Sequence, residues 1–164
     1  MAFWSQPTLE PKRLHRWILS INNIDAFVCK DVDKPKMEIT EVEHWYLNHA
    51  FYYPGRVKWE PISVTLVDPV DPDVSERLLR MIHESGYEFP EDANDTRTIS
   101  KVKATIALGT PRIKQIGPEG ETIEEWQLIN GWARNIDFGK LTYAEDGMLD
   151  ITLQIRFDYA KQVK

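Results

Sequence analysis

Hydrophobic and polar residues alternate strictly near the C-terminus, over residues 150–159 (DITLQIRFDY). Side chains of an extended chain point alternately to opposite faces, so the hydrophobic residues share one face and the polar residues share the other. The hydrophobic set is Ile151, Leu153, Ile155, Phe157 and Tyr159. The pattern predicts a long strand with one buried face and one charged face.

The first 70 residues are rich in strand-forming residues that are interrupted by turn signals. LHRWILSI from residue 14 and IDAFVCKDV from residue 24 flank Asn22 and Asn23, which predicts a β-hairpin. In KMEITEVEHWYL the alternation slips between Ile39 and Val42, which indicates a β-bulge. The next stretch, NHAFYYPGR, is aromatic but ends in Pro-Gly, and we interpret it as a loop with exposed or partner-covered rings. VKWEPISVTLVDP is then extended, with a bend at Pro61.

Residues 71–86 are predicted to form the one helix, with Asp71 or Asp73 as its cap and Gly86 as its end. Its apolar stripe consists of Val74, Leu78, Leu79 and Ile82. Strands are expected in SKVKATIALGTPRIKQIG, in ETIEEWQLING after the turn GPEGE, and in the segments that follow. About seven or eight strands and one helix predict a mainly β protein, a sandwich or barrel of two antiparallel sheets with one flanking α-helix. We expect a single domain over residues 1–164, with residues 1–12 as an extended N-terminal arm.

Composition and charge narrow the function classes. The net charge of −6 argues against a surface that holds nucleic acid by neutralising phosphates. Cys29 is the only cysteine, so no intrachain disulfide is possible and a reducing compartment is expected. The N-terminus lacks the pattern of a signal peptide, and no apolar run is long enough to span a bilayer, so we expect a soluble protein without a membrane partner.

Candidate chemistry is sparse. The four histidines, at positions 15, 44, 49 and 83, form no metal-binding spacing, and a lone Cys29 is more typical of a buried small side chain than of a nucleophile. The acidic pair Glu124 and Glu125 occupies adjacent positions that point to opposite sides of a strand, so we interpret it as solvated surface rather than a glycosidase dyad. We therefore expect no catalytic residue, metal or cofactor, and a structural or binding role with protein partners.

Three features, in order along the chain, resemble tail tube proteins of contractile-tailed bacteriophages. KRLHRWILSI is followed by WEPISVTL, which is similar to the family pattern W-x-x-[IV]-[ST]-V-T-L, and the helix comes directly after it. LINGW and IDFGKLTY then match L-x-[GN]-x-[WF] and [VI]-x-[FL]-G-x-L-x-[YW], before the final alternating strand. The resemblance extends from about Lys12 to Tyr159 and consists of packing residues rather than a catalytic signature.

The resemblance implies a two-sheet sandwich that assembles into hexameric rings, with strands of six subunits joined in a continuous inner β-barrel. Stacked rings would form the rigid tube beneath a contractile sheath, in a virion made in the host bacterial cytoplasm. The implied partners are further copies of the chain, the tail sheath protein, baseplate tube-initiator proteins, a tape-measure protein, and DNA that passes through the lumen without specific binding. An acidic lumen would repel phosphates and let DNA slide.

Two sets of residues are candidates for these contacts. The subunit and ring interface set is Phe3, Trp4, Tyr46, Phe51, Tyr52, Tyr53 and Arg56, residue types that are enriched at interface cores. The lumen set is Glu38, Glu41, Glu43, Asp150 and Asp158, which are expected on strands. The alternatives are that the rings pack within the subunit and that the acids lie on ordinary solvated faces.

Other functions remain open at this point. The same fold would serve a baseplate tube-initiator protein or the tube of a phage-derived injection device or type VI secretion system. From a different class, a monomeric carbohydrate-binding or enzymatic sandwich would present a ligand cleft and a flat aromatic platform.

Overall fold

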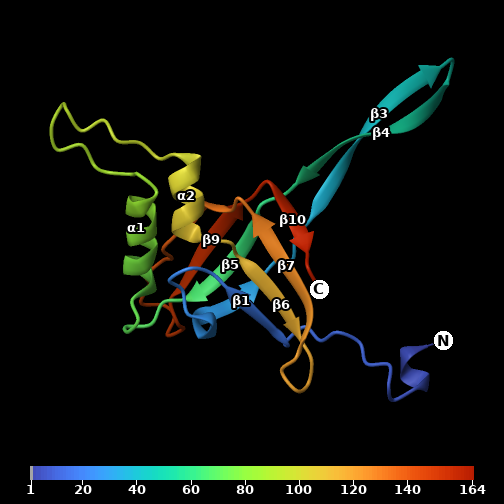
Figure 1. Cartoon of the computed structure of the whole chain (residues 1–164), viewed down its shortest axis with the longest axis horizontal. Helices are drawn as coiled ribbons and strands as arrows, with labels where there is room; N and C mark the ends of the chain where they lie inside the picture. Colours follow the sequence, from blue (N-terminus) through green and yellow to red (C-terminus); the bar gives the residue numbers. More distant parts are fainter. Residues whose placement is uncertain (1) are drawn as a thin grey trace.

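Two four-stranded antiparallel sheets form the body of the protein (Figure 1). The computed structural model describes residues 2–164, and at residue 3 the backbone alone. The first sheet has the order β1-β6-β7-β10, with β1 Trp17–Ser20, β6 Arg112–Ile116, β7 Thr122–Ile129 and β10 Tyr159–Gln162. The second has the order β2-β5-β9-β8, with β2 Cys29–Val32, β5 Ile62–Val67, β9 Asp150–Arg156 and β8 Trp132–Asp137. A third, two-stranded sheet consists of β3 Met37–Tyr46 and β4 His49–Trp59.

The core lies between the two large sheets, and β5 and β9 contribute its centre. Val64, Leu66 and Leu153 are each 0% exposed, and they alternate with polar residues on the outer face. Fully burying one such side chain stabilises the fold by roughly 1.5–3 kcal/mol. The predicted alternating strand is confirmed as far as Arg156.

The C-terminal strand is shorter than predicted, because the chain changes sheets. Phe157 is still buried, but at Asp158 the backbone N–H donates to the carbonyl of Ile129 at 3.0 Å, which starts the pairing of β10 with β7. Tyr159 is consequently 49% exposed, and its predicted place on the buried face is wrong. The crossover connects the two sheets of the body.

Helix α1, Val74–Glu84, confirms the helix predicted within residues 71–86. The Asp73 side chain accepts a hydrogen bond from the Glu76 N–H at 3.4 Å, and Gly86, with φ of 112°, follows the helix. Val74, Leu78 and Met81 are buried in the core. Leu79, predicted on the apolar stripe, is 58% exposed.

The prediction of a single helix is wrong, because α2 occupies Lys101–Leu108 where a strand was expected. Ser100 caps this helix by accepting from the Lys103 N–H at 3.3 Å, and Gly109 ends it with φ of 75°. The helical spacing of its small buried residues was masked by β-branched neighbours that lie on the exposed side. Its buried residues are Ala104, Ala107 and Leu108.

The predicted hairpin at Asn22 and Asn23 is half right. The turn exists, with φ of 62° at Asn23 and a bridge between Ile21 and Ile24. However, β1 pairs with β6 and β2 pairs with β5, so the two segments belong to different sheets. The short 3-10 helix η2, Ala26–Val28, turns the chain from one sheet to the other.

Two other turn predictions are confirmed. GPEGE connects β6 to β7, and its Gly117 N–H donates to the Glu121 carbonyl at 2.8 Å. Pro61 separates β4 from β5, which is the predicted bend. In Figure 1 the β3–β4 hairpin projects far from the body, and α1 and α2 lie on the opposite side. No helix within residues 2–164 has both the length and the apolar character needed to cross a membrane.

Candidate functional site

The β3–β4 hairpin is the main departure from a closed sandwich. The segment NHAFYYPGR, interpreted as a loop, belongs to strand β4 from His49 onward, so that prediction is wrong. Its Tyr and Phe residues are strong strand formers, and Pro54 and Gly55 lie at a bulge, where such residues are tolerated in a strand. The hairpin turns instead at Leu47, with φ of 54°, and Asn48.

The predicted bulge is confirmed between Ile39 and Glu41. Ile39 pairs with Val57 and Glu41 with Pro54, so β4 carries the extra residue. The Arg56 N–H donates to the Thr40 hydroxyl at 2.8 Å, and a Cβ on Gly55 would overlap that hydroxyl and lie 2.9 Å from the Thr40 carbonyl oxygen. Glycine is therefore required by the close approach of the two strands.

No residue of the hairpin strands is buried within the subunit. Every residue of β3 is exposed, and in β4 only Ala50 and Trp59 are half-buried. The exposed large hydrophobic residues of the hairpin are Met37, Ile39, Val42, Trp45, Tyr46, Leu47, Phe51, Tyr52, Tyr53 and Val57. An isolated two-stranded hairpin is marginally stable in water, and such a contiguous apolar patch marks a protein interaction site.

Beyond the bulge the hairpin has two distinct faces, because directly paired residues share a face. The acidic face carries Glu41, Glu43, Trp45, Ala50, Tyr52 and Pro54, and the histidine face carries Val42, His44, Tyr46, His49, Phe51 and Tyr53. On the histidine face the rings of His49 and Phe51 meet edge to face, with centroids 4.8 Å apart. Of the candidate interface residues in the hairpin, Tyr46, Phe51 and Tyr53 thus share the histidine face, whereas Tyr52 lies on the acidic face and Arg56 at the bulge.

The candidate lumen acids do not share one surface. On β3, Glu38 lies an odd number of positions from both Glu41 and Glu43. Because side chains alternate along a strand, Glu38 points to the opposite face from these two acids. Asp150 begins β9 and forms an ion pair with Lys30 at 3.0 Å. The expectation that all five acids lie on strands is wrong for Asp158, which lies between β9 and β10.

Asp158 instead holds α2 beside the crossover. Its carboxylate accepts from the Lys101 ammonium at 2.7 Å and from the Asn130 amide at 2.9 Å. These two hydrogen bonds lower the pKa of Asp158. Asp158 therefore connects α2 to the turn between β7 and β8.

The N-terminal arm contains one turn of 3-10 helix, η1 Phe3–Ser5, and is therefore not extended throughout as predicted. The arm is exposed from Gln6 to Lys12, and Trp4 is 79% exposed. The side chain of the other candidate, Phe3, lies outside the described part of the structure. In Figure 1 the arm leaves the body on the same side as the hairpin.

Glu124 is the functional candidate that the sequence analysis missed. It is 5% exposed rather than solvated, whereas its neighbour Glu125 points to the outer face and approaches Arg112 at 3.8 Å. The Glu124 carboxylate accepts hydrogen bonds from Lys12, at 2.9 Å, and Lys34, at 2.9 Å. The signal was present, because strand alternation places Glu124 on the same face as Trp126 and the buried Leu128.

The electrostatics of Glu124 follow from these partners. Burial alone would raise the pKa of Glu124, but hydrogen bonds from Lys34, Lys12 and the Trp126 indole outweigh burial and lower the pKa to about 2. The indole N–H donates to the second carboxylate oxygen at 2.8 Å. Glu124 is therefore ionised at neutral pH.

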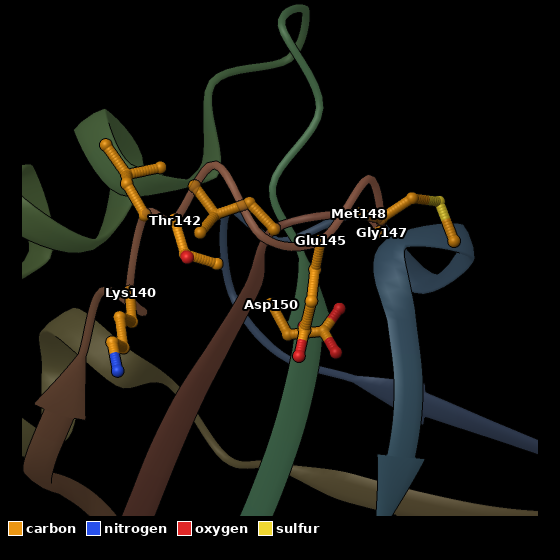
Figure 2. A pocket seen from close by; sticks show the side chains of 8 residues that line it. Lys140, Thr142, Glu145, Gly147, Met148 and Asp150 are labelled. Atoms are coloured by element: carbon orange, nitrogen blue, oxygen red, sulfur yellow. The ribbon is translucent and has the colours of Figure 1, made fainter.

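A shallow hollow of about 280 Å³ lies against the loop that connects β8 to β9 (Figure 2). Its side chains include Lys140, Glu145, Met148 and Asp150, and Figure 2 shows Lys140 and Met148 extending to opposite sides, away from the carboxylates. Within residues 2–164, no group of three or more His, Cys, Asp or Glu residues is arranged to hold a metal ion. Burial raises the pKa of the Cys29 thiol to about 11, which opposes a nucleophilic role.

Comparison with known proteins identifies the fold. No family model and no curated protein sequence matches the chain. A chain of the PVC extracellular contractile injection system, from its sheath–tube complex in the extended state, aligns with a TM-score of 0.67 and 13% identity over 93% of this chain and 90% of that chain. A chain of the sheath/tube terminator of the same system aligns with a TM-score of 0.66 and 12% identity over 94% and 98%.

A chain of the anti-feeding prophage baseplate gives a TM-score of 0.64 at 13% identity, over 94% of this chain and 96% of that one. These likenesses cover almost the whole chain at very low identity. The protein therefore has the fold found in tube-associated chains of contractile injection systems. The fold therefore agrees with the resemblance to tail tube proteins that the sequence motifs indicate.

Proposed function

We propose that this protein is a structural tube subunit of a contractile injection assembly, in which six copies form a ring and rings stack beneath a sheath. The observation that carries the proposal is the largely exposed β3–β4 hairpin on a body with the fold of a chain from a sheath–tube complex. A hairpin with this much apolar surface needs a partner, and further copies of the chain supply one at every ring. Because of the sequence motifs, we assign the protein the more specific role of a phage tail tube subunit, in a tube that conducts DNA.

The proposed intersubunit contacts are the hairpin and the N-terminal arm. Tyr46, Phe51 and Tyr53 on the histidine face, with Tyr52 on the acidic face, are the anchors, since buried aromatic residues dominate interface energetics. Trp4 of the arm and Arg56 at the bulge are secondary contacts. Joining strands between subunits would also cover the open edges of the two sheets, which are β1 and β10 in one and β2 and β8 in the other.

The proposed channel wall is the outer face of the β2-β5-β9-β8 sheet. At its centre, Ser63 and Thr65 of β5 pair with Gln154 and Thr152 of β9, which makes a face of small, hydrated side chains. The outer face of the other sheet carries exposed apolar residues such as Ile18 and Ile123, which suit protein contacts better.

Of the five candidate acids, only Asp150 lies on this polar sheet face, and Lys30 pairs with it. Arg156 also belongs to the face, at the other end of β9. The proposed wall is therefore polar with charges of both signs, and less acidic than the sequence suggested. Weakly charged, hydrated side chains still give a polyanion little to bind.

The remaining partners follow from the neighbours of known structure. Chains of this fold are found in complexes described as sheath–tube and tube-terminating. By analogy we propose a sheath protein around this tube and initiator or terminator proteins at its ends, with a tape-measure protein and then DNA in the lumen. The particle would be a virion assembled in a bacterial cytoplasm.

Negative-stain electron microscopy of the purified protein over a range of concentrations tests the proposal. We expect rings or tubes with a central hole. Uniform monomers at high concentration, combined with ligand binding in a cleft, would overturn it in favour of a carbohydrate-binding sandwich. Copy number in the native particle separates the tube from a baseplate initiator, and the presence of a capsid separates a phage tail from a secretion device.

A further inference from the structure

One buried carboxylate connects the two exposed segments of the subunit. Lys12 is the last residue of the N-terminal arm, and Lys34 lies three residues before β3 begins. Their ammonium groups bind the same oxygen, Oε2 of Glu124, each at 2.9 Å. The arm and the base of the hairpin are 112 and 90 residues away from Glu124 in sequence, so this contact is purely tertiary.

We infer that Glu124 is a positioning residue that sets the N-terminal arm and the β3–β4 hairpin relative to the body. We call the arrangement of Lys12, Glu124 and Lys34 the Glu124 junction. The inference concerns the free subunit, and its consequence for assembly rests on the proposed function.

The junction depends on the carboxylate more than on either lysine. The Glu124 side chain is 6% exposed, whereas the side chains of Lys12 and Lys34 are 52% and 49% exposed. A lysine that loses its partner can turn into water, but a buried carboxylate cannot. Two ammonium groups that share one oxygen also lie close together, and they would repel each other if its charge were removed. Loss of the charge on Glu124 is therefore expected to release both segments at once.

The remaining contacts define how far each segment is released. The carbonyls of Arg13 and Arg16 accept from the Gln115 amide at 2.6 and 3.0 Å, so the chain stays attached from residue 13 onward. At the hairpin base, the Glu60 N–H donates to the Lys36 carbonyl at 3.0 Å. Glu124 therefore fixes the direction of the arm and of the hairpin, while these other bonds keep their bases in place.

The surroundings of the junction leave room for movement. A cleft of about 350 Å³ between the two sheets is lined by Lys12, Lys34, Trp17 and Asp31, among others. The arm lies across this cleft rather than within a packed core. Small rotations at the junction would move the hairpin tip through a large arc, because the hairpin is long and only Trp59, at its base, packs against the core.

Electron-spin distance measurements on the free subunit test the inference. In a Cys29→Ala background, one label pair joins Gln6→Cys in the arm to Glu84→Cys on α1, and a second joins Asn48→Cys at the hairpin tip to Glu84→Cys. We expect Glu124→Gln to broaden both distance distributions. Lys12→Met should broaden only the arm distribution, Lys34→Met only the hairpin distribution, and Lys34→Arg should keep the parent width.

Glu125→Gln is the matched control, because it removes the same charge from the outer face of the same strand. Parent-like widths in Glu124→Gln, or equal broadening in Glu125→Gln, would overturn the inference. Should Glu124→Gln fail to fold, the double variant Lys12→Met/Lys34→Met must broaden both distributions for the inference to stand.

Assembly provides a separate readout. If the parent protein forms tubes, Glu124→Gln should raise the concentration needed for tube formation by about tenfold, with Glu125→Gln unchanged. A parent that forms no tubes would count against the proposed function alone, because the distance distributions decide the role of Glu124 in the free subunit.

Discussion

Strand β9 alternates strictly between apolar and polar residues, and β3 alternates with a slip after Ile39, yet the two strands differ completely in burial. In β9 the apolar residues Ile151, Leu153 and Ile155 are each 0% exposed. In β3 every residue is exposed, including Val42 and Trp45. The comparison shows that alternation predicts a strand but does not say whether its apolar residues are covered within the chain or by another molecule.

The two regions differ in what stabilises them. The body has a continuous buried apolar core between its two large sheets. The hairpin has its own strand pairing and, at its base, the Glu124 junction and the packing of Trp59 against the core, so most of its apolar surface remains available for association. Substitutions in the body should therefore reduce folding stability, and substitutions in the hairpin should reduce assembly.

The largest expected effect is in the body. Leu153→Ala should lower the free energy of unfolding by about 2–5 kcal/mol, because it leaves a cavity between the sheets. Urea denaturation followed by tryptophan fluorescence measures the change. Thr152→Ala, one residue away on the outer face, is the control and should change stability by less than about 0.5 kcal/mol. Equal losses in both variants would contradict the assignment of the two faces of β9.

The carboxylate of the Glu124 junction should become protonated in acid, which weakens the junction. Because the pKa of Glu124 falls from 4.5 to about 2 on folding, its stabilisation is complete above the unfolded pKa and is lost as pH falls toward 2. By linkage, about 2 kcal/mol of this stabilisation is lost by pH 3. Urea denaturation at pH 6 and pH 3 should show a larger loss for the parent than for Glu124→Gln. Parallel losses in the two proteins would show that Glu124 is not specifically stabilised as the anion.

Within the hairpin, Tyr52→Ala and Tyr53→Ala should leave the melting temperature unchanged and weaken tube formation, by about tenfold for a residue at the centre of an interface. The two tyrosines lie on opposite faces, so the larger effect identifies the face that a neighbouring copy covers. Sedimentation of assembled protein measures the change, with the exposed Tyr87→Ala on a distant loop as the control. Normal tube length and stability in both variants would remove these residues from the interface.

The most localised effect is expected at the bulge. Gly55→Ala should open the hairpin locally at a cost of about 1–3 kcal/mol, since its Cβ would press against Thr40. Hydrogen exchange of the β3 and β4 amides should accelerate, while exchange in β9 stays the same. Gly147→Ala is the matched control, because a Cβ there meets no atom within 4 Å. Acceleration across the whole protein would mean that the hairpin and the body unfold together.

The sequence predicted those features whose cause is local. Asp73 and Gly86 mark the two ends of α1, GPEGE makes its turn, and the slip after Ile39 shows the bulge, because caps, turns and alternation depend on residues a few positions apart. The second helix was missed although Ser100 and Gly109 flank it, because its β-branched residues favour a strand when considered alone.

Pairing and burial were decided only by the tertiary structure. The sequence could not show that β1 pairs with β6 and β2 with β5, since strand partners are chosen by packing between distant segments. It also gave no indication that Lys12 and Lys34 would meet at Glu124. Local periodicity therefore determined that this protein is built mainly of strands with a helix at their flank. Long-range contacts determined which surfaces are buried and left the hairpin exposed for a partner.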